Sequence, residues 1–172
     1  MNRKTKKGMT LIELLVAAFI FSVLMGLTAL ILRGGQEQAR YTETRMHLDE
    51  SLRQALSQMN LDLREASSSR TAIGNGGASL TIQTPASVSN SGNITWSNAL
   101  TFQVGGNGRQ LVKIDGGTRQ VTILANDIQS VNFTATGNPT ATVRYTLTAQ
   151  RALWNGRNIS VNSTGEARLR NG

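Results

Sequence analysis

The sequence predicts an α+β protein, in which one long N-terminal helix, embedded in a membrane over its first half, packs on an antiparallel β-sheet head. Three observations predict this: an apolar run from Met9 to Leu32, helical periodicity that resumes after it, and short alternating apolar runs further on. We therefore divide the chain into four segments: a basic leader at 1–8, a membrane helix at 9–32, its amphipathic continuation at 33–66 and a β-rich head at 67–172.

The composition excludes several classes of function. The 172 residues include 18 Lys+Arg and 10 Asp+Glu but no cysteine, which excludes disulfides, thiolate metal sites and cysteine nucleophiles. His47 is the single histidine, so a histidine metal cluster or a Ser/His/Asp relay is not expected, and we place His47 at the surface or bonded to neighbours. The sequence indicates no enzyme activity, cofactor or metal.

The leader and the apolar run together predict a membrane anchor. Arg3, Lys4, Lys6 and Lys7 precede the 24-residue run from Met9 to Leu32. As a helix this run would extend about 36 Å, enough to cross a bilayer core of about 30 Å. It is longer than the apolar region of a secretory signal peptide, and no small-x-small cleavage site follows, so we expect it to be retained. The positive-inside rule places the N-terminus in the cytoplasm and the head outside.

Glu13 is the one ionisable side chain in the apolar run. A carboxylate inside a membrane span costs about 2–3 kcal/mol, so it needs a partner or a role. One interpretation is local: Thr10 and Glu13 fit a capping box at the start of the helix. The other requires cleavage after Gly8, so that Glu13 neutralises the Met9 amine of a neighbouring subunit and fixes the register of assembly. The residues leave both open.

The run Lys6-Lys7-Gly8-Met9-Thr10-Leu11-Ile12-Glu13-Leu14-Leu15-Val16 resembles the prepilin signal of type IV pilins and type II secretion pseudopilins. The resemblance implies that a prepilin peptidase cleaves after Gly8 and methylates the amine of Met9. It also implies that Glu13 pairs with the N-terminal amine of a neighbour, with Thr10 beside it in the assembly motif. Leu30 stands where major pilins usually carry a helix-kinking proline, which argues against the abundant major subunit.

The continuation of the helix is predicted from periodicity. Gly34-Gly35 interrupts the pattern and is expected to loosen or bend the helix. From residue 36 to residue 66, apolar residues recur every three or four positions and form a stripe that should pack on the core: Leu48, Leu52, Leu56, Met59, Leu63 and Ala66. Ser67-Ser68-Ser69 should end the helix.

The head is predicted to be an antiparallel sheet, because its apolar residues alternate and short polar or glycine-rich turns separate the runs. The expected strands centre on Leu80–Ile82, Leu100–Val104, Leu111–Ile114, Val121–Ile123, Val131–Phe133 and Val143–Leu147. The expected turns are Gly74–Gly77, Ser89–Asn93, Gly105–Gly108, Asp115–Gly117 and Gly137-Asn138-Pro139. A stretch without helices between its strands does not suit a dinucleotide-binding βαβ fold.

Three blocks extend the resemblance to a pilin-like fold and to J-type minor pseudopilins and PilW-like minor pilins: Leu52 to Ala66, Leu124 to Phe133, and Arg168-Leu169-Arg170-Asn171. The resemblance implies a minor subunit at or near a filament tip. Its implied partners are the prepilin peptidase, other major and minor pilins (I- and K-type subunits in a secretion system) and the inner-membrane assembly platform. It implies a single-pass protein of the bacterial inner membrane that later enters a pilus or pseudopilus.

Other candidate sites are interpreted as structural. Asp115-Gly116-Gly117 and Asn126-Asp127 lack the acid series of a calcium loop and are expected to be turns. Gly105–Gly108 lacks the Lys-Ser/Thr of a phosphate loop. The basic set Arg144, Arg151, Arg157, Arg168 and Arg170 is expected to be solvated or paired, and DNA is not an expected partner.

Two alternatives remain. The first alternative is a permanently signal-anchored binding module outside the membrane. The second is a competence-pilus subunit that contacts DNA. The first explains the span but leaves the Gly8 junction and Glu13 without a purpose. Secretion pseudopilus, type IV pilus and competence pilus all fit the sequence.

Overall fold

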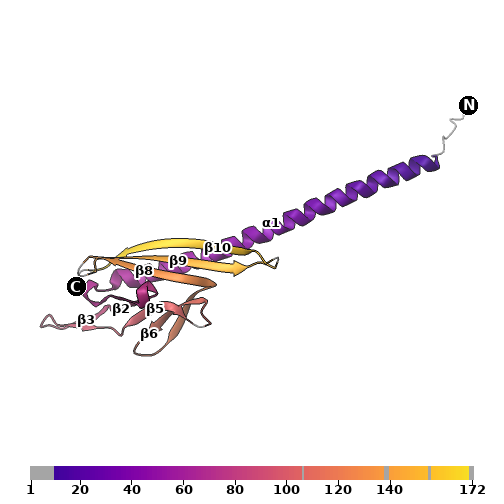
Figure 1. The fold of residues 1–172 in the computed structure, drawn as a ribbon. Coiled ribbons are helices and arrows are strands. Elements are labelled where there is room, and N and C mark those ends of the chain that lie inside the picture. The colour runs from indigo at the N-terminus through magenta and orange to yellow at the C-terminus, as the bar shows by residue number, and fades with distance from the viewer. Residues whose placement is uncertain (1–9, 106, 138–139, 155, 171–172) are drawn as a thin grey trace, which may run out of the picture. The chain divides into compact units, whose positions relative to one another are not determined.

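The structure is a computed structural model and describes residues 10–105, 107–137, 140–154 and 156–170. The chain forms two compact units, Met1–Thr42 and Glu43–Gly172. The described part of the first unit is Thr10 and the portion of helix α1 (Leu11–Glu65) that ends at Thr42. The second unit contains the C-terminal part of α1 and all the described strands (Figure 1).

Helix α1 continues through Gly34 and Gly35. The pair therefore interrupts the apolar pattern without ending the helix, and the expected loosening or bending at this pair stays a prediction. Each glycine lowers the stability of a helix by about 1 kcal/mol relative to alanine, and the helical turns on both sides offset this cost. A Cβ at either position would meet no atom within 4 Å, so neither glycine is required for close packing.

The first unit presents an apolar helix surface. Every described residue from Thr10 to Thr42 is exposed, including the aliphatic and aromatic side chains between Leu11 and Leu32. This part of α1 is long and apolar enough to cross a membrane. Exposed side chains of this kind are suited to lipid or to the helices of neighbouring subunits rather than to water.

In the second unit α1 supplies one side of the hydrophobic core. Its buried side chains are Leu48, Leu52, Ala55, Met59 and Leu63. Ala66, directly after the helix, is also buried, whereas Leu56 is only half-buried, since Ala55 occupies the core-facing position there. A hydrogen bond of 2.9 Å from Lys113 Nζ to Asp62 Oδ2 ties the helix to the sheet.

Among the described residues of the head, all strand pairs are antiparallel, as predicted, but the strands form three sheets instead of one. The five-stranded sheet has the order β1-β2-β5-β6-β7, the three-stranded sheet β10-β9-β8, and the two-stranded sheet pairs β3 with β4. All six predicted strands are confirmed: β2 (Ser79–Ile82), β5 (Leu100–Gly105), β6 (Gln110–Asp115), β7 (Val121–Asn126), β8 (Ile128–Thr136) and β9 (Thr142–Ala152).

Four of the described strands were not predicted: β1 (Ala72–Gly74), β3 (Pro85–Val88), β4 (Ile94–Trp96) and β10 (Asn158–Arg168). Short helices η1 (Ser68–Arg70) and η2 (Asn75–Gly77) flank β1. The expected turn Gly74–Gly77 is largely the short helix η2. Two other expected turns are described only in part, because Gly106 of Gly105–Gly108 and Asn138 and Pro139 of the turn at 137–139 lie outside the described residues.

Strand β10 was missed because its apolar pattern is sparse. Only Ile159, Val161 and Ala167 of its 11 residues are buried hydrophobics. Gly165 stands opposite Tyr145 of β9, and the tyrosine ring fills the space where a side chain at position 165 would lie. The hydrophobic surface that buries β10 at this point therefore comes from its neighbour, and this is invisible in the sequence of β10.

Candidate functional site

The start of α1 forms a complete capping box. The backbone N–H of Thr10 donates to Glu13 Oε2 at 2.9 Å, and the Thr10 hydroxyl donates to the same oxygen at 3.1 Å. In return the backbone N–H of Glu13 donates to Thr10 Oγ1 at 3.4 Å. The local interpretation of this pair is confirmed. Gly8 and Met9, the proposed cleavage junction, lie outside the described residues.

The capping box uses only one oxygen of the Glu13 carboxylate. Both bonds from Thr10 end on Oε2, and no described residue donates a hydrogen bond to Oε1. The carboxylate lies beside a shallow apolar depression lined by Ile12, Val16, Ala17 and Ile20. The carboxylate therefore lies on an exposed apolar helix with one of its two oxygens unbonded to any described residue.

The two candidate calcium turns are occupied by other interactions. Asp115 Oδ1 accepts the backbone N–H groups of Gly117 at 2.8 Å and Thr118 at 3.1 Å, which is an Asx turn. The hydrogen bonds from Thr118 and Gly117 lower the pKa of the Asp115 carboxyl below its ordinary value. The prediction of turn chemistry is confirmed here.

Asp127 has a backbone φ of 59°, the left-handed conformation that Asp tolerates in turns. Its carboxylate forms an ion pair with Arg151 at 2.6 Å and contacts Arg109 at 3.9 Å. Arg109 also donates to the carbonyl oxygen of Gln150. This cluster joins the link between β7 and β8 to β9, so Asp127 has a structural role.

The remaining polar candidates do not converge on a site. Arg144 pairs with Glu166 at 2.9 Å, as expected for paired arginines, and His47 is exposed. Across the described parts of the chain, no three His, Asp or Glu side chains gather in a group able to hold a metal ion.

An exposed face of α1 in the second unit carries apolar and basic side chains. Leu61 is 61% exposed and lies in a depression that Arg53 and Arg64 also line. Asn60 lines it too, and its Oδ1 is buried without a hydrogen-bond partner in the described structure. This face of α1 therefore combines exposed apolar surface with positive charge.

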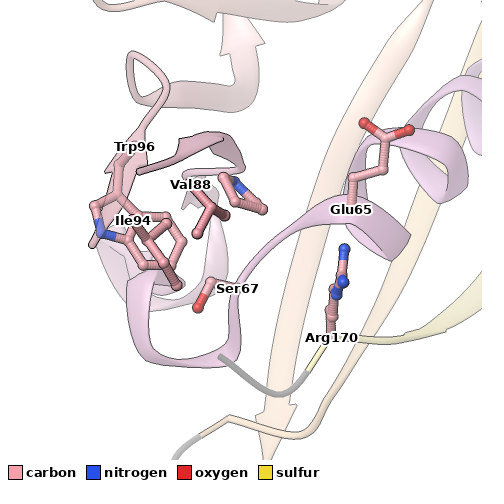
Figure 2. A pocket seen from close by; sticks show the side chains of 7 residues that line it. Glu65, Ser67, Val88, Ile94, Trp96 and Arg170 are labelled. Carbon is pink, nitrogen blue, oxygen red and sulfur yellow. The ribbon is translucent and has the colours of Figure 1, made fainter. Parts of the chain in front are cut away.

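A deeper groove of about 220 Å³ lies where α1 ends (Figure 2). The β3–β4 hairpin supplies its apolar wall: Pro85, Val88, Ile94 and Trp96. Glu65, Ser67 and Arg170 complete it. The backbone N–H of Ser68 donates to the carbonyl of Arg170 at 3.0 Å, and the N–H of Arg170 donates to Ala66 at 3.1 Å, so the C-terminal segment is held against the helix exit.

Sequence reasoning missed this groove. In the structure the guanidinium of Arg70 lies over the ring of Trp96, 5.4 Å from the ring centroid. Val88 is 65% and Ile94 42% exposed. Apolar residues on both sides of the Ser89–Asn93 turn, between positions 85 and 96, are typical of a hairpin and could have predicted β3 and β4.

Comparison with known proteins gives one match. Residues 3–29 match the family described as the prokaryotic N-terminal methylation motif. No curated protein and no solved structure matches the chain. The matched segment contains the basic leader, Gly8, the capping box and most of the apolar helix. It supports a type IV pilin-like family for this chain, anchored by a single apolar helix, processed by prepilin peptidase and assembled with other pilins.

Proposed function

We propose that the chain is a non-catalytic minor pilin or pseudopilin, a structural subunit at or near the tip of a type II secretion pseudopilus or a type IV pilus. The observation that carries this proposal is the Glu13 carboxylate, presented on an exposed apolar helix directly after a basic segment that ends in Gly8. The motif match over residues 3–29 supports the same class of subunit.

The proposed assembly step uses the free oxygen of Glu13. Prepilin peptidase cuts after Gly8 and methylates the new N-terminus at Met9, which leaves a cationic amine. Glu13 lies four residues further along, about 6 Å or one helical turn. A neighbour displaced by about this distance brings its amine to Oε1 of Glu13 while Thr10 continues to bond Oε2. The pairing offsets the cost of the carboxylate in the membrane only when the stagger is correct.

The proposed location follows from charge. Four basic residues precede the span, which favours a cytoplasmic N-terminus and an extracytoplasmic head in the bacterial inner membrane before assembly. The J-like and PilW-like blocks and Leu30 in place of the proline of major pilins support a minor subunit. I- and K-type subunits are the proposed partners in a secretion system, and the inner-membrane assembly platform is the proposed partner in each system.

The first test is the mass of the protein from its native host, with and without prepilin peptidase. We expect the mature chain to lack residues 1–8 and to carry one methyl group on Met9 only when the peptidase is present. An identical, uncut N-terminus in both samples contradicts the proposal and favours a permanently anchored binding module instead.

The second test separates the charge of Glu13 from its capping function. Glu13→Gln removes the charge, whereas Thr10→Val removes the hydroxyl but keeps the carboxylate. We expect Glu13→Gln to be cleaved normally but largely absent from sheared filaments, and Thr10→Val to be incorporated at a reduced level. Glu37→Gln, an exposed acid of the same helix beyond the apolar run, is the matched control and should behave as wild type. Normal incorporation of Glu13→Gln would remove the register argument.

A further inference from the structure

The solvent side of α1 in the second unit carries a depression whose residues all belong to that helix. It has a volume of about 400 Å³ and is lined by Arg53, Leu56, Ser57, Asn60, Leu61 and Arg64. Leu61 is 61% exposed there, although Met59 and Leu63 on the other side of the same turns are fully buried. The depression therefore faces away from the core of its own chain.

The spacing of the lining residues is that of a surface to which a second helix packs. Residues 53, 56, 57 and 60 form one set with steps of three, one and three positions, and residues 57, 60, 61 and 64 form a second. Four residues with this spacing form the hole that receives one side chain of a facing helix. The depression thus consists of two adjoining holes that share residues 57 and 60, and a helix is the element that fits it.

The depression carries two positive charges without a partner. Arg53 and Arg64 are exposed, form no ion pair with any described residue, and share the depression with no acid. Of the acids near them in sequence, Glu50 accepts a hydrogen bond from a glutamine, Asp62 is bonded to the sheet, and Glu65 lines the groove of Figure 2. The two arginines are eleven residues apart, about 16 Å along the helix. They are therefore left to pair with acids of a partner.

No other described helix of this chain can fill the depression, because η1 and η2 have three residues each. The same face of a second copy would set arginines against arginines, which is unfavourable. We propose that the depression binds an acidic amphipathic helix of a different filament subunit, with apolar side chains in the two holes beside Leu61 and carboxylates at Arg53 and Arg64. This inference rests on the proposed function, which supplies the class of partner, and deepens it by naming the surface and its chemistry.

The chain has no cysteine, so a single introduced cysteine can mark the site. Ser57→Cys places it at an exposed position shared by the two holes. The full-length variant is labelled with a benzophenone maleimide in native-host membranes that contain the other filament subunits, and is then illuminated. We expect an adduct with another prepilin-type subunit. Mass spectrometry should locate it on a helix whose facing side carries apolar residues between two acids about eleven positions apart.

Substitutions test the charge and the apolar contact separately. Arg53→Glu combined with Arg64→Glu should lower the adduct yield at least about tenfold, and changing the two mapped acids of the partner to lysine should restore most of it. Arg119→Glu, at an exposed arginine of the β6–β7 hairpin, is the matched control and should leave the yield unchanged. Leu61→Ala should also lower the yield, whereas Ile123→Ala, at an exposed aliphatic position of β7, should not. All four positions are exposed, so an unchanged Tm separates lost binding from lost folding.

Several results would overturn the inference: an adduct with a second copy of this chain, with lipid, or with a strand or loop of another subunit, and a yield insensitive to the arginine reversals. The mass of the N-terminus and the content of sheared filaments in the same samples report on the proposed function. A cut chain that enters filaments without giving the adduct contradicts only this inference. An uncut chain contradicts the proposed function, and the assigned class of partner with it.

Discussion

The close approach of Tyr145 to Gly165 predicts a large effect from a very small substitution. A Cβ added at Gly165 would lie 2.4 Å from Cε2, 2.5 Å from Cζ and 2.6 Å from the hydroxyl of Tyr145. Ordinary contacts of a Cβ begin at 3.4 Å. Gly165→Ala therefore requires the tyrosine ring, or β10 itself, to move by about 1 Å.

The ring has little freedom to move. Tyr145 is fully buried, and its ring centroid lies 6.5 Å from that of Phe133, its neighbour on β8. Overpacking of a core costs about 1–3 kcal/mol, and the reduced freedom of the unfolded chain on replacing glycine by alanine returns about 0.4–1 kcal/mol. We expect Gly165→Ala to lower the free energy of unfolding by about 1–2 kcal/mol and the Tm by roughly 3–8 °C.

The assay is thermal unfolding of the detergent-solubilised full chain, followed by near-UV circular dichroism, with two further variants of Tyr145. Tyr145→Leu removes the ring, so Gly165→Ala should cost little in that background. Tyr145→Phe should itself be neutral or stabilising, because burial raises the pKa of the tyrosine to about 12 and its hydroxyl has no hydrogen-bond partner in the described residues. Gly165→Ala should remain costly in the phenylalanine background, where the ring is retained. Equal costs of Gly165→Ala in the tyrosine and leucine backgrounds would refute the reasoning.

Two other contacts give measurable expectations. The Lys113–Asp62 ion pair has side chains 21% and 19% exposed, so Asp62→Asn or Lys113→Met should each cost about 1–2 kcal/mol in denaturant unfolding, between the values for surface and buried pairs. A double-mutant cycle should show coupling between the two substitutions. Strictly additive losses of unfolding free energy would show that the ion pair does not stabilise the packing of α1 on β6. The lowered pKa of Asp115 contributes stability above the ordinary value of 3.8 that is lost as the pH falls through the folded-state value. Asp115→Asn should therefore show a smaller loss of Tm than wild type between about pH 4 and pH 2, and identical pH profiles would contradict this role.

The sequence by itself determined the part of this protein whose physics is local. The capping box depends on Thr10 and Glu13 three residues apart, and the anchor depends on a continuous apolar run; both are read along one helix. The six predicted strands carry alternating apolar residues of their own. The core stripe of α1 was predicted for the same reason, although Ala55, and not Leu56, takes the buried position.

Only the tertiary structure decided which strands share a sheet and where the surfaces meet. Strand β10 is stabilised by 11 pairings with β9 and by the ring of Tyr145 over Gly165, interactions that lie on another strand. The groove likewise joins Glu65, Trp96 and Arg170, residues far apart along the chain. Helix caps and amphipathic periods are encoded by neighbours in sequence. Strand pairing and grooves depend on side chains that other segments of the chain supply, and for that reason they became visible only in the folded chain.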